Sequence, residues 1–181
     1  NLLLIPDHYL FRMLYSQGIS LESLGVPRID DGPVETDMRK IWHMFASNYH
    51  LFRGTPSGLW MDHVFYEVFG MKERFSTATA DSFYDAINEK LHTDAYRPRA
   101  LLDQFNIEVI ATTEGAVDEL VHHRVIAGTP WARRVITTFR PDDAIDPDRD
   151  DFIDNVTRLG EMTREDTGRW DGYLAAMRAR R

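Results

Sequence analysis

The stretch IEVIATT at residues 107–113, together with RVITTF at residues 134–139, decides the fold class of this chain. Both runs are rich in β-branched residues and have the length of a strand, and the segment between them is typical of a helix. A strand, a helix and a second strand within about 35 residues make a βαβ unit, whose strands run parallel. Two strands alone cannot make a stable parallel sheet, because its faces and edges must both be covered, so we expect a larger, helix-dominated α/β fold.

The residues ahead of this unit, 1–96, show helical periodicity and no strand pattern. Asp7 is expected to cap a helix that ends at Gly18, because aspartate is a preferred cap and glycine a preferred end. Residues 20–35 contain two glycines and two prolines and are expected to form a loop. Thr36 is expected to cap the second helix.

Two more helices are predicted before residue 96. The first is expected to carry Leu59, Trp60, Val64 and Val68 before Gly70, and the second to begin near Thr79. After the strands, Thr163 and Asp166 resemble a capping box that opens the last helix. Aromatic residues at helical spacing are expected to fill the core of the helical part: Trp42, Phe45, Tyr49, Trp60, Phe65, Phe69, Phe83 and Tyr84.

Composition narrows the class of protein. The 181 residues are 43% apolar, as in globular proteins, and contain no apolar run long enough to span a membrane. The net charge of −8 argues against binding to nucleic acid. The absence of cysteine excludes disulfides and thiolate metal sites and is compatible with a cytoplasmic protein. The chain opens at Asn1 inside an apolar segment without signal-peptide features, so we expect it to be cut from a longer protein.

The seven histidines show no metal-ligand spacing. His122 and His123 are neighbours on a predicted helix and point about 100° apart. Two turns, roughly 10 Å of helix rise, separate His43 from His50. His63 and its neighbour one turn on, a glutamate, could share an ion, but a surface pair is the commoner arrangement. No metal site made wholly within this chain is predicted.

Arg140 directly follows the second predicted strand, and the carboxyl ends of parallel strands are where α/β folds hold ligands. A guanidinium there suits bidentate binding of a carboxylate or a phosphate. An ion pair with Asp142 or Asp143 explains the same residue equally well.

A second candidate group lies at the start of the first helix, where Asp7, His8, Tyr9 and Arg12 crowd together. The Tyr9 phenol can donate and accept a hydrogen bond, and imidazoles such as that of His8 titrate near neutral pH. The alternative is an ordinary solvated helix N-terminus.

These residues belong to a set of motifs that resembles the uronate isomerases (glucuronate isomerases) of the amidohydrolase superfamily. The motifs occur in that family's order across nearly the whole chain: DHYxxR at 7–12, LWMDH at 59–63, ExFG at 67–70, TAD at 79–81, NIEVIATT at 106–113 and TFRPD at 138–142.

The resemblance implies a (β/α)8 (TIM) barrel. Residues 1–96 would be a helical insertion after its first strand and residues 97–181 a βαβα portion, with strands 107–113 and 134–139 as the second and third. It further implies interconversion of aldo- and keto-hexuronates, D-glucuronate with D-fructuronate or D-galacturonate with D-tagaturonate, through an enediol. No cofactor is implied within this chain, although a divalent metal such as zinc can occur in full-length members.

The resemblance also implies roles for individual residues. Arg140 would bind the substrate carboxylate, Tyr9 would act on the reacting carbons with His8 beside it, and Arg12 would be a supporting charge. The family's H-x-H strand would lie upstream of this chain and its late-strand Asp and Arg downstream, so we expect little or no activity from the isolated chain. Glu114-Gly115 departs from the family pattern, which leaves the role of that loop open.

An alternative function is a non-catalytic helical module that binds a partner. Under the isomerase hypothesis the expected partner is a hexuronate sugar acid, with no nucleic acid and no membrane. Self-association is also expected, because four apolar strand residues lack neighbouring strands: Val109, Ile110, Val135 and Ile136.

Overall fold

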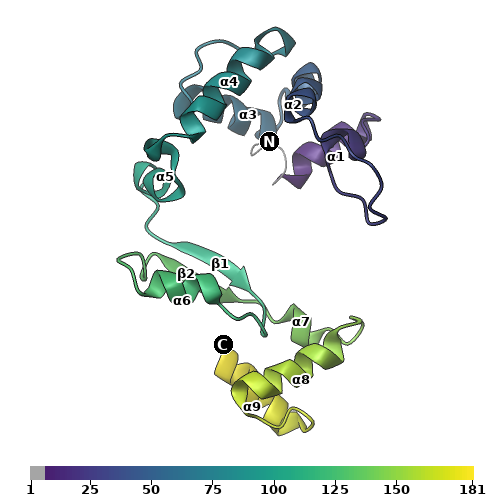
Figure 1. The fold of residues 1–181 in the computed structure, drawn as a ribbon, viewed down its shortest axis with the longest axis vertical. Helices are drawn as coiled ribbons and strands as arrows, with labels where there is room; N and C mark the ends of the chain where they lie inside the picture. Colours follow the sequence, from purple (N-terminus) through teal and green to yellow (C-terminus); the bar gives the residue numbers. More distant parts are fainter. Residues whose placement is uncertain (1–6) are drawn as a thin grey trace. The chain divides into compact units, whose positions relative to one another are not determined.

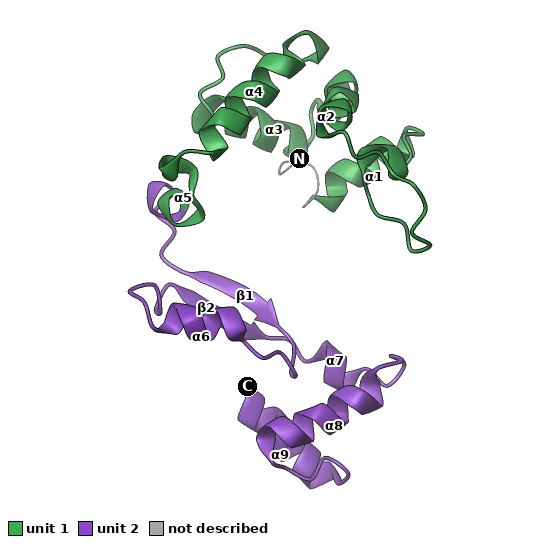
Figure 2. Cartoon of the chain, viewed as in Figure 1, with its two compact units in different colours: residues 1–101 green, residues 102–181 purple. Residues whose placement is uncertain are grey.

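The computed structural model describes residues 7–181, so the apolar segment at the N-terminus lies outside the described residues. The chain divides into two compact units, residues 1–101 and 102–181 (Figure 2). The sequence suggested a division between residues 96 and 97; the two units instead meet inside one short helix. Within residues 7–181, no helix is both long and apolar enough to cross a membrane.

The first unit is built of helices and short helical turns (Figure 1). They are α1 (His8–Ser16), η1 (Glu22–Leu24), α2 (Met38–Ser47), η2 (Tyr49–Phe52), α3 (Pro56–His63), η3 (Val64–Val68), η4 (Thr77–Thr79), α4 (Ala80–Leu91), η5 (Asp94–Tyr96) and the start of α5 (Pro98–Gln104). Among these, η3 is a π-helical turn and the other η elements are 3₁₀ turns.

The helix starts show which side chains act as caps. Asp7 caps α1 as predicted, and its carboxylate accepts from the amide of Tyr9 at 2.8 Å. The prediction for α2 was wrong by one residue, because Asp37 caps it and accepts from the amides of residues 39 and 40. The amide of Thr36 is held instead by the carboxylate of Glu35 at 3.0 Å, which keeps Thr36 outside the helix.

An aromatic core fills the first unit, as the spacing of its aromatic residues predicted. The Phe75 ring lies at its centre, with ring centroids 5.0 Å from Trp42 and 5.1 Å from Phe83. The indole of Trp42 donates to the carbonyl of Ala80 at 2.8 Å, so its buried N–H has a partner. The buried hydrophobic residues here are Leu10, Leu14, Leu24, Ile41, Trp42, Phe45, Ala46, Phe52, Met61, Phe65, Phe69, Phe75, Ala80, Phe83 and Ile87.

Of the apolar residues predicted for the segment that forms α3 and η3, Val64 and Val68 pack against the core, whereas Trp60 does not occupy the core position predicted for it. Leu59 is 76% exposed and Trp60 45% exposed, whereas Met61 and Phe65 are buried. Apolar residues lie all around this segment, so periodicity alone did not single out one face. The π-helical turn η3, in which the amide of Phe69 bonds to the carbonyl five residues earlier, then brings Phe65 and Phe69 into the core.

Two side chains close the end of η3. The ammonium of Lys90 donates to the carbonyl of Phe69 at 2.7 Å, and the hydroxyl of Tyr96 donates to the carbonyl of Val68 at 2.6 Å. The rings of Phe69 and Tyr96 are stacked with centroids 5.5 Å apart. The last turn of the π-helical segment is therefore tied to the end of α4 and to η5.

The second unit contains the predicted βαβ unit. Strands β1 (Ile110–Glu114) and β2 (Val135–Phe139) pair in parallel, with Ile110 opposite Val135, and α6 (Val121–Ala127) connects them (Figure 1). The helix-dominated α/β class is therefore confirmed. The first strand begins three residues later than predicted, and α6 starts only after Leu120, whose φ of 54° is left-handed. Val117 consequently lies ahead of this helix, in the segment that follows β1.

A small second core lies among α7 (Asp142–Ile145), α8 (Phe152–Thr163) and α9 (Trp170–Arg180). Its buried residues are Ala116, Val117, Ala144, Leu159 and Ala176. The capping box predicted at Thr163 was wrong: the Thr163 hydroxyl donates to the carbonyl of Leu159 at 2.7 Å, inside α8. A threonine hydroxyl can bond its own helix as readily as cap the next, and α9 begins later.

Candidate functional site

Two of the predicted site residues share one face of α1. Leu10 and Leu14 are fully buried and anchor the helix. Tyr9 and Arg12, followed by Met13 and Ser16, lie at positions i, i+3, i+4 and i+7 and line a cavity of about 330 Å³. A phenol and a guanidinium therefore face the same space.

The opposite wall of this cavity comes from η2 and the start of α3. Phe52, Thr55 and Ser57 form it. The Thr55 hydroxyl donates to the carbonyl of Phe52 at 2.7 Å and accepts from the amide of Gly58 at 3.0 Å, which caps α3. Gly58 has no substitute here, because a Cβ would lie 2.2 Å from the Phe52 carbonyl oxygen.

His8 has a different position. It is exposed and is not among the residues that line the cavity. Its ring lies against that of Tyr9, with centroids 4.1 Å apart and planes tilted by 34°. The structure thus brings Tyr9 and Arg12 to one cavity and places His8 against the phenol ring.

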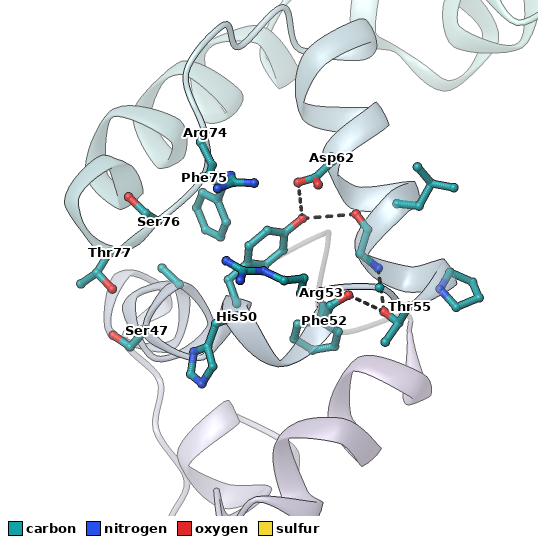
Figure 3. A pocket seen from close by; sticks show the side chains of 16 residues that line it. Ser47, His50, Phe52, Arg53, Thr55, Asp62, Arg74, Phe75, Ser76 and Thr77 are labelled. Carbon is teal, nitrogen blue, oxygen red and sulfur yellow. Dashed lines mark hydrogen bonds between the residues drawn. The ribbon is translucent and has the colours of Figure 1, made fainter.

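Figure 3 shows a larger cavity, of about 770 Å³. Phe52 and Thr55 line both this cavity and the first. On its lining, the hydroxyl of Tyr49 donates to the carboxylate of Asp62 at 2.8 Å. Burial, aided by this hydrogen bond to a carboxylate, raises the pKa of Tyr49 well above its usual value. Arg53 and Arg74 also line this cavity, and neither was a predicted site residue. The exposed Leu59 lies on its lining too.

Arg140, in the second unit, follows β2 as predicted. Its amide donates to the carbonyl of Glu114 at 2.9 Å, which extends the strand ladder by one bond. Its guanidinium donates through Nε to the carboxylate of Asp142 at 2.7 Å, so the ion pair considered as the alternative is present. The Arg140 side chain is nevertheless 69% exposed, and only Nε is engaged by Asp142. Asp143 acts elsewhere: its carboxylate accepts from the amide of Ala116 at 3.1 Å.

The alternation of the sheet indicates the face on which Arg140 lies. Thr112 faces α6, since its hydroxyl lies 2.7 Å from Nε2 of His123. Thr113 therefore lies on the other face, and its register partner Thr138 lies there with it. Arg140 comes two residues after Thr138 and continues the same alternation, on the exposed face away from α6.

Glu114, whose role the sequence left open, lies on the α6 face. Its side chain is only 13% exposed, and its Oε1 lies 3.5 Å from Nε2 of His123. Its Oε2 is buried without a hydrogen-bond partner among residues 7–181. Gly115 beside it leaves room for Asp143, whose Oδ2 would lie 2.4 Å from a Cβ at that position. Glu114 thus faces away from the side that carries Arg140.

The histidines make no metal-binding cluster in the part of the chain that the structure describes. No group of three or more His, Asp or Glu side chains there has an arrangement that could hold an ion. His43 lies 3.0 Å from Asp81, and His123 lies between Thr112 and Glu114. The residues present therefore do not fit a metal centre by themselves.

Comparison with known sequences gives a consistent result over the whole chain. A family model described as glucuronate isomerase matches residues 1–181. The uronate isomerase of Mesorhizobium japonicum is 56% identical over 181 residues, which are 100% of this chain and 39% of that relative. The uronate isomerase of Rhizobium meliloti is 54% identical over 100% of this chain and 39% of its own length. The chain thus spans about two fifths of the curated relatives it matches.

Solved structures agree with the sequences. The crystal structure of glucuronate isomerase from Caulobacter crescentus matches 97% of this chain with a TM-score of 0.89 and 48% identity, and the match covers 36% of that chain. The crystal structure of uronate isomerase from Thermotoga maritima matches 96% of this chain with a TM-score of 0.81 at 27% identity. The fold described above is therefore one that crystallography has recorded in such proteins.

Proposed function

Because the chain belongs to the glucuronate isomerase family, we propose that it forms part of a uronate isomerase, an aldose–ketose isomerase acting on hexuronates. The substrates are pairs such as D-glucuronate with D-fructuronate and D-galacturonate with D-tagaturonate. The chain spans about two fifths of its curated relatives, so the activity is that of the whole protein. This chain supplies residues for binding and proton transfer.

In this proposal β1 and β2 are the second and third strands of a (β/α)8 barrel, and residues 1–96 are a helical insertion after the first strand. Their parallel pairing and the helix on one face of the sheet support this assignment. The exposed face, which carries Thr113, Thr138 and Arg140, then looks into the barrel. Ligands of such barrels bind at the carboxyl ends of the strands, which is the end where Arg140 lies.

The reaction moves a proton from C2 to C1 through an enediol. A base removes the C2 proton while the C1 carbonyl oxygen gains a proton; the enediol then loses the O2 proton as C1 is protonated, which leaves a C2 ketone. A phenol can give a proton to O1 and accept one from O2, so we assign this work to Tyr9, with His8 against its ring. Arg12 contributes positive charge to the same cavity as Tyr9.

The observation that carries this proposal is the position of Arg140. Its guanidinium is exposed, engaged only through Nε, and on the face of the sheet that α6 leaves uncovered. Rotation of the side chain away from Asp142 frees Nε and both Nη atoms of the guanidinium to bind the C6 carboxylate of a uronate. No step is assigned to a metal, since residues 7–181 hold no group of side chains arranged to bind one by themselves.

The test is conversion of glucuronate to fructuronate by the full-length protein and by the isolated 181 residues. We expect turnover by the full-length protein, on glucuronate or galacturonate, and little or none by the isolated chain. Absence of turnover on both uronates by a folded full-length protein would refute the function. Turnover by the isolated chain at the full-length rate would refute the claim that its site is incomplete.

A further inference from the structure

The larger cavity of the first unit is lined by positively charged side chains. Arg53 and Arg74 on its lining are positively charged, and Asp62 is the only carboxylate among the described residues that line it (Figure 3). The carboxylate of Asp62 already accepts from the phenol of Tyr49. The cavity is therefore basic in a chain whose net charge is −8.

Arg53 and Arg74 are not neutralised by any acidic side chain in the described part of the chain. Within residues 7–181, neither Arg53 nor Arg74 forms an ion pair or a guanidinium hydrogen bond. Arg39 of the same unit, by contrast, bonds to the carboxylates of Asp81 and Asp85. Two unpaired guanidinium groups on one cavity create a field that favours an anion.

The rest of the lining suits a small organic anion. The ring of Phe75 is buried beneath the cavity, and Leu59 offers an exposed apolar surface at its side. The hydroxyl of Thr77 bonds to no other described group and remains available as a donor. A volume of about 770 Å³ lies within the range of sites that hold small molecules.

We propose that this cavity is an anion-binding site, in which Arg53 and Arg74 grip the charged oxygens of a carboxylate or phosphate group on a small metabolite. Guanidinium forks bind both groups through parallel charge-assisted hydrogen bonds, and Thr77 adds a neutral donor. The site lies wholly within the first unit, between residues 46 and 77, and does not include Arg140. It does not depend on the isomerase reaction.

The experiment titrates the ¹⁵N-labelled 181-residue chain with sodium phosphate, sodium glucuronate and uncharged glucose at constant ionic strength. We expect saturable shifts of the amides of Arg53, Arg74 and Thr77 with at least one of the two anions and none with glucose. Phosphate and glucuronate tell the two oxyanion chemistries apart. The readout is binding, so it is independent of whether the full-length protein turns over uronates.

Variants assign the binding to the two arginines. Arg53→Gln and Arg74→Gln should each weaken the affinity by about tenfold or more, since each removes charge-assisted hydrogen bonds. Both side chains are exposed and unpaired, so the fold should tolerate the changes. Arg178→Gln, an exposed arginine in α9, is the matched control and should leave the affinity within about twofold. Non-saturable shifts, or equal weakening by Arg178→Gln, would overturn the proposal.

Discussion

Arg140→Lys in the full-length protein separates a substrate-binding role from a structural one. The side chains of the Arg140–Asp142 pair are 69% and 56% exposed, and such pairs contribute about 0–1 kcal/mol to stability. A lysine can also pair with Asp142, so the free energy of unfolding should change by less than about 0.5 kcal/mol. Loss of the bidentate grip on a carboxylate should instead cost about 2–4 kcal/mol, roughly 30- to 1000-fold in kcat/KM.

The assay is kcat/KM for glucuronate, measured beside urea unfolding of the same variants. Asp142→Asn is the matched control, because it removes the ion pair and leaves the guanidinium in place. We expect it to stay within about threefold of the wild-type kcat/KM, a difference of roughly 0.7 kcal/mol. If Arg140→Lys also stays within that range, or if Asp142→Asn lowers kcat/KM as much as Arg140→Lys does, then the ion pair explains Arg140 and the substrate does not.

Four further outcomes test other parts of the structure. Tyr9→Phe in the full-length protein should lower kcat with little change in KM, because it removes a proton-transferring hydroxyl and leaves the binding charges; a raised KM with unchanged kcat would contradict this. Gly58→Ala should lower the free energy of unfolding by about 1–3 kcal/mol, because the new Cβ meets the carbonyl of Phe52. Ser57→Ala is its control, and equal free energies of unfolding in urea for the two variants would contradict this. The pKa of Tyr49 is higher in the folded chain than its ordinary value of 10, so the stability that Tyr49 contributes is present below pH 10 and is lost as the pH rises above it. In Tyr49→Phe, the free energy of unfolding should therefore fall less steeply with pH in this alkaline range. The isolated chain should self-associate through its exposed strand face, which includes Ile136, and a molar mass by light scattering that stays monomeric at all concentrations would disprove this.

The parts of the fold that were predictable are those in which one pattern had one explanation. The β-branched run around Ile136 fits a strand and little else, so the parallel pair followed from spacing alone. Phe45 and Phe83 repeat with other apolar residues at helical spacing and are both buried. The prediction for Trp60 failed because the apolar residues around it are not confined to one face of a regular helix. The π-helical turn that brings Phe65 and Phe69 into the core cannot be recognised from a 3.6-residue period.

The residues of the candidate site were likewise predictable only in part. Arg140 was identifiable because it directly follows a parallel strand, where α/β folds bind ligands. Both interpretations considered for it, ligand binding and an ion pair, are compatible with its geometry. Arg53 and Arg74 were not identifiable. They lie 21 residues apart and in no common element, and only the packing around Phe75 brings them to one cavity. Their unpaired state depends on where every neighbouring carboxylate lies, which is a property of the folded chain.

The bonds that close η3 also determine how the first unit comes apart locally. The carbonyls of Val68 and Phe69 are held by side chains that lie about 20 to 30 residues further along the chain, those of Tyr96 and Lys90. Fraying of the π-helical turn would leave these carbonyls without their partners and unstack the ring of Phe69, so it requires the end of α4 and η5 to release at the same moment. We therefore expect residues 64–96 to open as one cooperative unit, in which amides distant in sequence exchange with solvent together.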